Sequence, residues 1–157
     1  MEISHFNIGI LHSLIGKNDG VSIVIDQTVR SMVDDLNMDI QIIGFSTVRE
    51  ADGLAMSSRN KYLTEQERPS ALTLFKSLKL AQKFYSKGER KASVIINKIK
   101  KLIERAPYTK IDYVKICDAK TLKDVYEIKR QSVLALAVKV GKTRLIDNYV
   151  LGEELKI

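Results

Sequence analysis

The segment Ser132–Val140 constrains the fold most, because residues 133 to 138 are all apolar. An apolar run of this length is typical of a strand that lies inside a sheet with both faces covered. The Gly141-Lys142 pair follows as a turn, and the apolar residues from Leu145 to Leu151 predict a return strand. A further strand is predicted over Ile111–Cys117, because it is rich in β-branched and aromatic residues. Together these segments predict a small antiparallel sheet.

Two amphipathic helices are predicted before the sheet. The first covers Ser70–Tyr85 and ends near Gly88, and the second covers roughly Glu89–Arg105 and is stopped by Pro107. Short connections favour an antiparallel helical hairpin that covers the sheet, so the predicted fold class is α+β. The apolar positions expected to be buried are Ala71, Leu74, Phe75, Leu78, Ala81, Tyr85, Ala92, Ile95, Ile96, Ile99, Leu102 and Ile103.

The first half of the chain also carries local structural signals. Asp26–Asn37 has apolar residues at helical spacing and ends on a residue that suits a helix end, and Asp39–Phe45 reads as a buried strand. Thr64 and Glu67 form a capping-box pattern. Pro69 would interrupt a helix that began there, so it is expected instead in the first turn of the main helix.

The run READGLAMSSRN, residues 49 to 60, is the candidate functional segment. We expect it to be too polar to lie in a core, and its Asp-Gly pair favours a tight turn because glycine adopts positive φ without strain. Ser57, Ser58 and Arg59 then place two hydroxyls beside a guanidinium, a set of donors that matches phosphate oxygens. The run is either a phosphate-binding loop or a solvated loop leading into a helix, since motifs this short also arise by chance.

Composition predicts one domain of ordinary size, or one domain with a small appendage, from 157 residues of which 45% are apolar. The single cysteine, Cys117, excludes an internal disulfide and fits a structural residue in a reducing compartment. No apolar run approaches the roughly 20 residues that span a bilayer, and residues 1–14 lack the basic start of a secretory signal. We therefore expect a cytoplasmic protein without a membrane partner.

The positive charge is concentrated in one part of the chain. Residues 76–110 contain eleven Lys or Arg against two Glu, a net of +9, whereas the whole chain carries +7. Such a cluster is typical either of a nucleic-acid-binding surface or of the solvated face of a helical pair. The helical pattern accounts for the lysines and few aromatic residues lie among them, so the solvated face is the preferred interpretation and nucleic acid is not an expected partner.

All twelve residues from 49 to 60 resemble the C-terminal nucleotide loop of the pantothenate synthetase family, ATP-dependent ligases that join pantoate to β-alanine. The resemblance covers about residues 30–157 and implies that the chain is the C-terminal part of such an enzyme. Residues 48–157 would then form its lid domain, and residues 1–47 a divergent segment followed by the helix and strand remnant of a nucleotide-binding α/β domain. The similarity continues in Arg30–Gly44, Tyr62-Leu63, Gly88–Arg90, Ile111–Val114 and Arg144–Asn148.

The resemblance also implies which residues act. Ser57, Ser58 and Arg59 would contact the triphosphate of ATP, bound as its Mg²⁺ complex, and would serve catalysis by stabilising charge on phosphate oxygens. Met56 would add backbone contacts, and Val48 would lie near the adenine. Lys61 would either add a phosphate contact or be solvated. Pantoate would first form an acyl-adenylate, from which the amine of β-alanine would then displace AMP. No protein ligands for a metal are predicted.

The chain is expected to depart from the family before Arg30. The family's H-x-G-H motif belongs to its larger N-terminal domain, and the two histidines here, His5 and His12, lack that spacing. Residues 1–29 are therefore expected to have another origin, either like the strand-to-loop opening of some nucleotide-sugar glycosyltransferases or as an edge strand. The functional alternative is a non-catalytic nucleotide-binding or interaction module that works with a separate N-terminal polypeptide. The sequence also leaves open whether the chain forms a homodimer.

Overall fold

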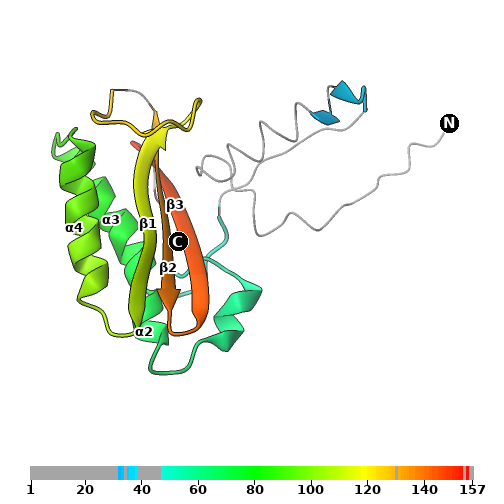
Figure 1. The fold of residues 1–157 in the computed structure, drawn as a ribbon, viewed down its shortest axis with the longest axis vertical. Helices are drawn as coiled ribbons and strands as arrows, with labels where there is room; N and C mark the ends of the chain where they lie inside the picture. Colours follow the sequence, from blue (N-terminus) through cyan, green and yellow to red (C-terminus); the bar gives the residue numbers. More distant parts are fainter. Residues whose placement is uncertain (1–31, 34, 39–46, 130, 154, 156–157) are drawn as a thin grey trace.

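The sheet predicted from the apolar segments is present in the protein, analysed as a computed structural model that describes residues 32–33, 35–38, 47–129, 131–153 and 155. Three antiparallel strands are described, β1 (Thr109–Asp118), β2 (Ser132–Val140) and β3 (Thr143–Leu151), in the order β1-β2-β3 (Figure 1). The apolar strand β2 is central, which confirms the prediction.

The β2–β3 hairpin fixes the register of the sheet. Val140 pairs with Thr143 across the two-residue Gly141-Lys142 turn, in which Gly141 has a φ of 56°. One face of β2 is completely buried, with Leu134, Leu136 and Val138 at 0% exposure. A one-residue slip would move this apolar set to the other face, so the buried face and the tight turn specify the same register.

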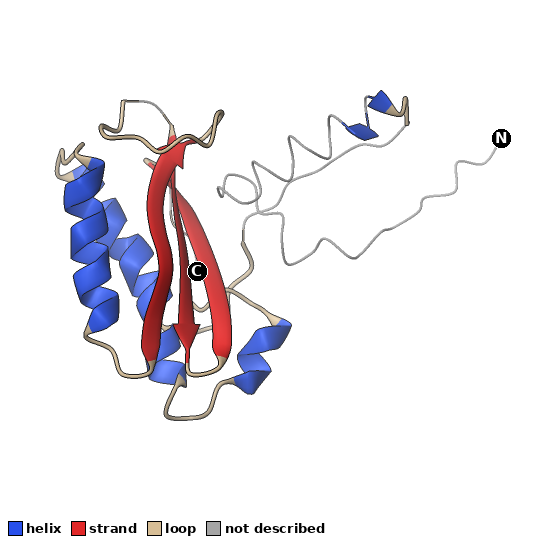
Figure 2. Cartoon of the chain, in the orientation of Figure 1, coloured by secondary structure: helices blue, strands red, loops and turns tan. Residues whose placement is uncertain are grey.

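Helices α3 (Thr73–Ser86) and α4 (Ala92–Glu104) pack side by side on one face of the sheet, with α4 against β1 and α3 against β3 (Figure 2). This is the predicted helical cover. Ile95, Ile99 and Ile103 of α4 are fully buried. The predicted burial is wrong for Tyr85, Ile96 and Leu102, which are only partly buried. The structure therefore confirms an α+β architecture with one sheet face covered by a helical pair.

The start of the first helix differs from the prediction. A short helix, α2 (Arg68–Ala71), precedes α3, and Leu72 separates the two. Pro69 lies in the first turn of α2, where a missing backbone N–H leaves no helical hydrogen bond unmade. The predicted capping box is present immediately before it, because the Glu67 carboxylate accepts from Thr64 N–H at 2.9 Å and the Thr64 hydroxyl accepts from Glu67 N–H at 3.2 Å.

Little of the N-terminal third falls within the described residues. Met32, Val33 and Asp35 are helical, and Asn37 has a φ of 48°, a conformation common just beyond helix ends. The predicted helix end near Asn37 is thus supported. The predicted strand at 39–45 and all the interpretations of residues 1–29 lie outside the described residues. Across the part of the chain that the structure describes, no helix is long and apolar enough to cross a membrane.

Candidate functional site

The 49–60 segment begins with a tight turn, residues 49–55, which is closed by backbone hydrogen bonds and is called the neck below. Arg49 and Ala55 form an isolated antiparallel bridge, the N–H of Glu50 donates to the carbonyl of Leu54 at 2.8 Å, and the N–H of Gly53 donates to the carbonyl of Glu50 at 2.8 Å. The predicted tight turn is confirmed, with Gly53 at a φ of 94°. Beyond the neck the chain enters a 3-10 helix, η2 (Ser58–Tyr62).

Part of this neck belongs to the core, so the prediction that the segment is too polar to be buried is wrong there. Leu54 is 2% exposed and joins the main apolar cluster, and Gly53 is also buried. A Cβ on Gly53 would come within 2.2 Å of the Phe75 ring on α3. Glycine is therefore required at position 53 both by its backbone conformation and by this close approach.

A buried ion pair joins the neck to the sheet. The Arg49 guanidinium donates from Nη1 to one oxygen of Asp147 at 2.8 Å and from Nη2 to the other at 3.0 Å. Both side chains are almost fully buried, at 3% and 2% exposure. Arg49 also donates to the carbonyl of Gly53 at 3.1 Å and lies 4.7 Å from the centre of the Phe75 ring. These contacts hold the turn against β3 and α3.

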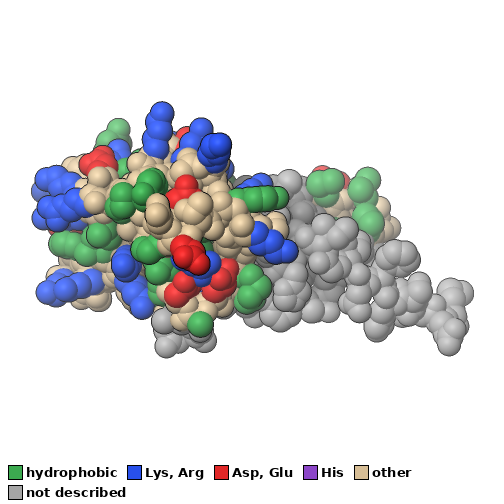
Figure 3. All heavy atoms as spheres, turned by 90° about the horizontal axis from the view of Figure 1, so that it is seen from below, with side chains coloured by type: hydrophobic (Ala, Val, Ile, Leu, Met, Phe, Trp, Pro, Cys, Tyr) green, Lys and Arg blue, Asp and Glu red, His purple; other side chains and the backbone are tan. Residues whose placement is uncertain are grey.

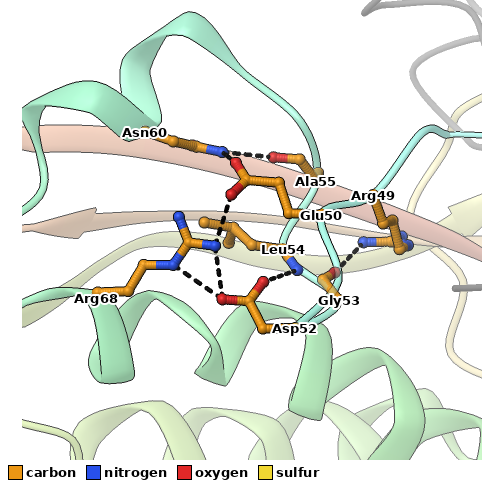
Figure 4. A network of polar contacts seen from close by, with 8 residues as sticks. All are labelled: Arg49, Glu50, Asp52, Gly53, Leu54, Ala55, Asn60 and Arg68. Atoms are coloured by element: carbon orange, nitrogen blue, oxygen red, sulfur yellow. Dashed lines mark hydrogen bonds and ion pairs between the residues drawn. The ribbon is translucent and has the colours of Figure 1, made fainter.

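A second polar network, drawn in Figure 4, ties the neck to α2 and η2. Arg68 of α2 contacts the carboxylates of Glu50 at 2.7 Å and Asp52 at 2.6 Å. The amide nitrogen of Asn60 donates both to Glu50 and to the carbonyl of Ala55 at 3.0 Å. The network therefore joins three elements that flank the Ser57–Arg59 donors.

The charges of this network stabilise one another. Hydrogen bonds from Arg68 and then Asn60 hold the pKa of Glu50 below its usual value. Burial alone would raise the pKa of Asp52, but the hydrogen bonds from Arg68 and the Leu54 N–H outweigh it and the net pKa is lowered. The pKa of Arg68 is raised by the same carboxylates. All three groups therefore remain charged at neutral pH.

The predicted donors lie at a cleft of about 370 Å³ between the segment and β3. The Ser57 hydroxyl accepts from the N–H of Arg59 at 3.2 Å and so caps η2, while Ser58 and Arg59 are exposed. Met56 is 52% exposed and also lines the cleft. The lining residues among those described are Leu54, Ala55, Met56, Ser57, Ser58, Arg59, Asn60, Tyr62, Arg144, Leu145 and Ile146.

Two candidate residues do not line this cleft. Val48 is 44% exposed and its carbonyl accepts from the N–H of Met56 at 2.9 Å, so it contributes to the neck. Lys61 is exposed on η2 but is absent from the lining. The structure thus brings Met56, Ser57, Ser58 and Arg59 together and leaves Val48 and Lys61 outside the cleft lining.

The cleft is cationic. Its described lining includes Arg59 and Arg144 but no carboxylate, which suits a negatively charged ligand. No group of three or more His, Cys, Asp or Glu able to hold a metal occurs within the described ranges. The donors in the cleft lining fit phosphate oxygens.

Several residues of the site were not predicted from the sequence. Arg49 and Asp147 are 98 positions apart, and no local pattern relates them. The ion pairs of Arg68 with Glu50 and Asp52 join α2 to the neck, and no sequence pattern indicated them. Arg144 and Asp147 belong to a segment that carried the family resemblance, which is the signal that could have drawn attention to them.

The basic face is separate from this cleft. The lysines of α3 and α4 are mostly exposed, and Figure 3 shows many Lys and Arg side chains at the edge of the molecule where these helices lie. Lys79 stacks over Phe75, with its ammonium 4.5 Å from the ring centre. Exposed lysines fit both interpretations of this basic cluster, so the solvated face stays a prediction.

Fold and cleft define a class of protein, a small α+β domain that presents hydroxyl and guanidinium donors around an open, cationic cleft. The family model described as pantoate-beta-alanine ligase matches residues 11–150. The chain belongs to this family.

Relatives with high sequence identity support the same family membership. A pantothenate synthetase of Syntrophus aciditrophicus is 54% identical over 153 residues, which is 97% of this chain and 52% of that protein. One from Moorella thermoacetica is 54% identical over 123 residues, or 78% of this chain and 44% of that protein. The chain therefore spans about half the length of the curated relatives it matches.

The solved structures show the same fold. A pantothenate synthetase structure from Thermus thermophilus matches with a TM-score of 0.72 at 30% identity, covering 82% of this chain and 45% of that one. A Francisella tularensis ligase, described as complexed with beta-gamma ATP and beta-alanine, matches with a TM-score of 0.57 at 24% identity, over 87% of this chain and 42% of that one.

The extent of the family match corrects one prediction. The resemblance was expected to begin near residue 30, and residues 1–29 were expected to have another origin. The family model instead begins at residue 11, and the alignment with the Syntrophus protein takes in nearly the whole chain. Most of residues 1–29 therefore belongs to the family match and not to a glycosyltransferase-like opening. Short, polar segments around Gly16 and Gly20 carry too little local pattern to identify a family.

Proposed function

We propose that this chain is the C-terminal part of an ATP-dependent ligase that condenses pantoate with β-alanine through a pantoyl-adenylate. The observation that supports this most directly is the position of Ser58 and Arg59 on η2, exposed at a cationic cleft beside a neck that two polar networks hold in place. The Francisella ligase structure described as complexed with beta-gamma ATP and beta-alanine supports the same ligand classes.

In the first step, a carboxylate oxygen of pantoate attacks the α-phosphorus of ATP and the bond to pyrophosphate breaks. In the second, the neutral amine of β-alanine attacks the acyl carbon, AMP leaves with the bonding electrons, and the amine loses a proton. The role of Ser57, Ser58 and Arg59 is to bind and orient the phosphates and to stabilise the charge that develops on their oxygens. Mg²⁺ enters as part of the nucleotide substrate.

The division of the chain follows from this function. Residues 48–157 form a lid domain, and residues 1–47 combine an N-terminal segment with a remnant of the nucleotide-binding domain. When the lid closes, its donors reach the phosphates and water is excluded from the labile adenylate. Met56 contributes backbone contacts and Val48 lies near the adenine in the closed state. The proposed setting is the cytoplasm.

Pantoate-dependent ATP–pyrophosphate exchange tests this proposal, because exchange requires a complete adenylating site. The purified chain is compared with Arg59→Ala and with Arg105→Ala, which removes an exposed arginine at the end of α4. Removing one charge-assisted phosphate contact costs about 1.5–3 kcal/mol, so Arg59→Ala should lower exchange by roughly 10- to 150-fold. Arg105→Ala should exchange as the unaltered chain does.

The same assay distinguishes the proposed ligase from a second candidate, a non-catalytic nucleotide-binding module. This second candidate uses the same exposed donors to bind a nucleotide but assigns no adenylation step to the chain. It predicts no exchange by the folded chain alone, whether monomer or homodimer, and exchange restored by adding the N-terminal half of a relative as a separate polypeptide. Exchange that is unaffected by Arg59→Ala would contradict both candidates.

A further inference from the structure

Arg144 is a second cation at the cleft, and nothing in the proposed mechanism uses it. It lies on β3, whereas Arg59 lies on η2, so the two guanidinium groups belong to different walls of one cleft. Between them the described lining supplies hydroxyls, an amide and apolar side chains but no carboxylate. Two arginines without a competing acid in the lining favour an extended anion over a single small one.

The orientation of Arg144 is fixed by residues outside the cleft. Its Nε donates to an oxygen of Asp112 at 2.8 Å, and its Nη2 forms an ion pair with the same oxygen at 2.7 Å. The guanidinium also lies 5.9 Å from the centre of the Tyr113 ring. The Nε hydrogen bond occupies one of the five N–H donors that an arginine carries. Arg144 is therefore held in one direction while keeping donors for a ligand.

The strand that supplies these contacts is distorted at this point. The register of β1 against β2 shifts between Ile111 and Tyr113, which leaves Asp112 as the extra residue of a bulge. Bulges turn side chains in new directions and are common beside active sites. Arg144 and Asp112 are 48% and 42% exposed, and ion pairs this exposed contribute little to folding stability. The pair is thus better explained by positioning than by stability.

We propose that the cleft binds a linear polyphosphate chain between Arg59 and Arg144, with Arg144 as a phosphate-binding residue. This inference rests on the proposed function, because the β- and γ-phosphates of ATP and the released pyrophosphate are both such chains. Serine hydroxyls and the Arg59 guanidinium contact one end, and Arg144 contacts the other. A cleft of about 370 Å³ lies within the usual range for small-ligand sites.

Binding of inorganic tripolyphosphate to the full chain, measured by calorimetry, tests the inference without requiring catalysis. Arg144→Gln is compared with Lys142→Gln, which removes the same charge from the exposed turn two residues away and outside the cleft lining. Arg144→Gln is expected to raise the Kd for tripolyphosphate at least tenfold, and Lys142→Gln less than threefold. Arg144→Lys keeps the positive charge but lacks the planar guanidinium, so its Kd should lie between those of Arg144→Gln and Lys142→Gln.

Parallel titrations identify the source of the phosphates. If Arg144→Gln weakens the binding of pyrophosphate, the released product binds at Arg144. If Arg144→Gln weakens the binding of ATP but not of AMP, the β- and γ-phosphates of ATP lie at Arg144. Equal binding by Arg144→Gln and Lys142→Gln would overturn the inference, as would a folded chain without saturable tripolyphosphate binding in the millimolar range. Arg59-dependent exchange that survives Arg144→Gln unchanged, with unchanged tripolyphosphate affinity, would overturn the inference and leave the proposed function standing.

Discussion

The guanidinium of Arg49 and the carboxylate of Asp147 form two parallel hydrogen bonds, at 2.8 and 3.0 Å, with both side chains almost completely buried. Arg49 lies at the neck of the candidate loop and Asp147 lies on β3. This pair therefore connects the loop that carries the phosphate donors to the strand that carries Arg144. It links folding of the sheet to the placement of the site.

Breaking this pair from one side should destabilise the domain strongly. Arg49→Met leaves Asp147 buried without its cation, and Asp147→Asn leaves Arg49 without its anion. Each is expected to lower the free energy of unfolding by about 3–5 kcal/mol, measured by urea denaturation. The double variant Arg49→Met/Asp147→Leu removes both charges and should be more stable than either single variant. Single variants that each cost less than about 1 kcal/mol would contradict a structural role for the pair.

Replacing Gly53 should show how tightly the neck is packed. Gly53→Ala must accept both a positive φ and a Cβ within 2.2 Å of the Phe75 ring. Gly88→Ala is a matched control, because Gly88 has nearly the same φ, 91° against 94°, and nothing within 4 Å of the added Cβ. We expect Gly88→Ala to cost about 1 kcal/mol from backbone strain alone. Gly53→Ala should cost about 1–3 kcal/mol more from overpacking, and equal melting temperatures would contradict the packing argument.

The parts of the fold that the sequence predicted depend on short-range patterns. The central position of β2, the Gly141-Lys142 turn and the capping box of Thr64 and Glu67 each follow from residues within a few positions of one another. The division of the first helix into α2 and α3 was missed, because the apolar spacing continues across Leu72 while the backbone does not.

The candidate site was predicted only in part, for a related physical reason. The exposed donors Ser58 and Arg59 stand together in sequence and were recognisable from their chemistry. The residues that position them come from the neck, α2 and β3, and contacts across 16 to 98 positions leave no periodic signal. Buried charge is also rarely expected in a polar loop, so the sequence alone places Arg49 at the surface.

The network around Arg68 should make stability sensitive to acid. The pKa values of Glu50 and Asp52 are lowered in the folded state, so the unfolded chain binds more protons than the folded chain as the pH falls through their usual range. Stability from these groups is present above about pH 5 and is lost as the pH falls through their lowered pKa values. Arg68→Gln should flatten the dependence of the urea midpoint on pH between about 2 and 5, whereas Arg105→Gln should leave it unchanged.

Asn60 is expected to control the direction of the phosphate donors. Its amide nitrogen bonds Glu50 and the carbonyl of Ala55, and so closes η2 back onto the neck. Asn60→Asp keeps the shape but replaces this donor with a negatively charged oxygen beside another carboxylate, so the contact becomes repulsive. Asn97→Asp introduces the same charge at an exposed position of α4 and serves as the control.

Because like charge and a lost donor act together in Asn60→Asp, the affinity for tripolyphosphate should fall about tenfold or more, and backbone amides of residues 57–60 should exchange hydrogen faster. Asn97→Asp should change the affinity less than threefold, since a distant surface charge is screened by salt. If both variants weaken binding equally, net charge rather than the Asn60 contacts decides affinity. If exchange of the 57–60 amides is unchanged while binding weakens, Asn60 would instead contact the ligand directly.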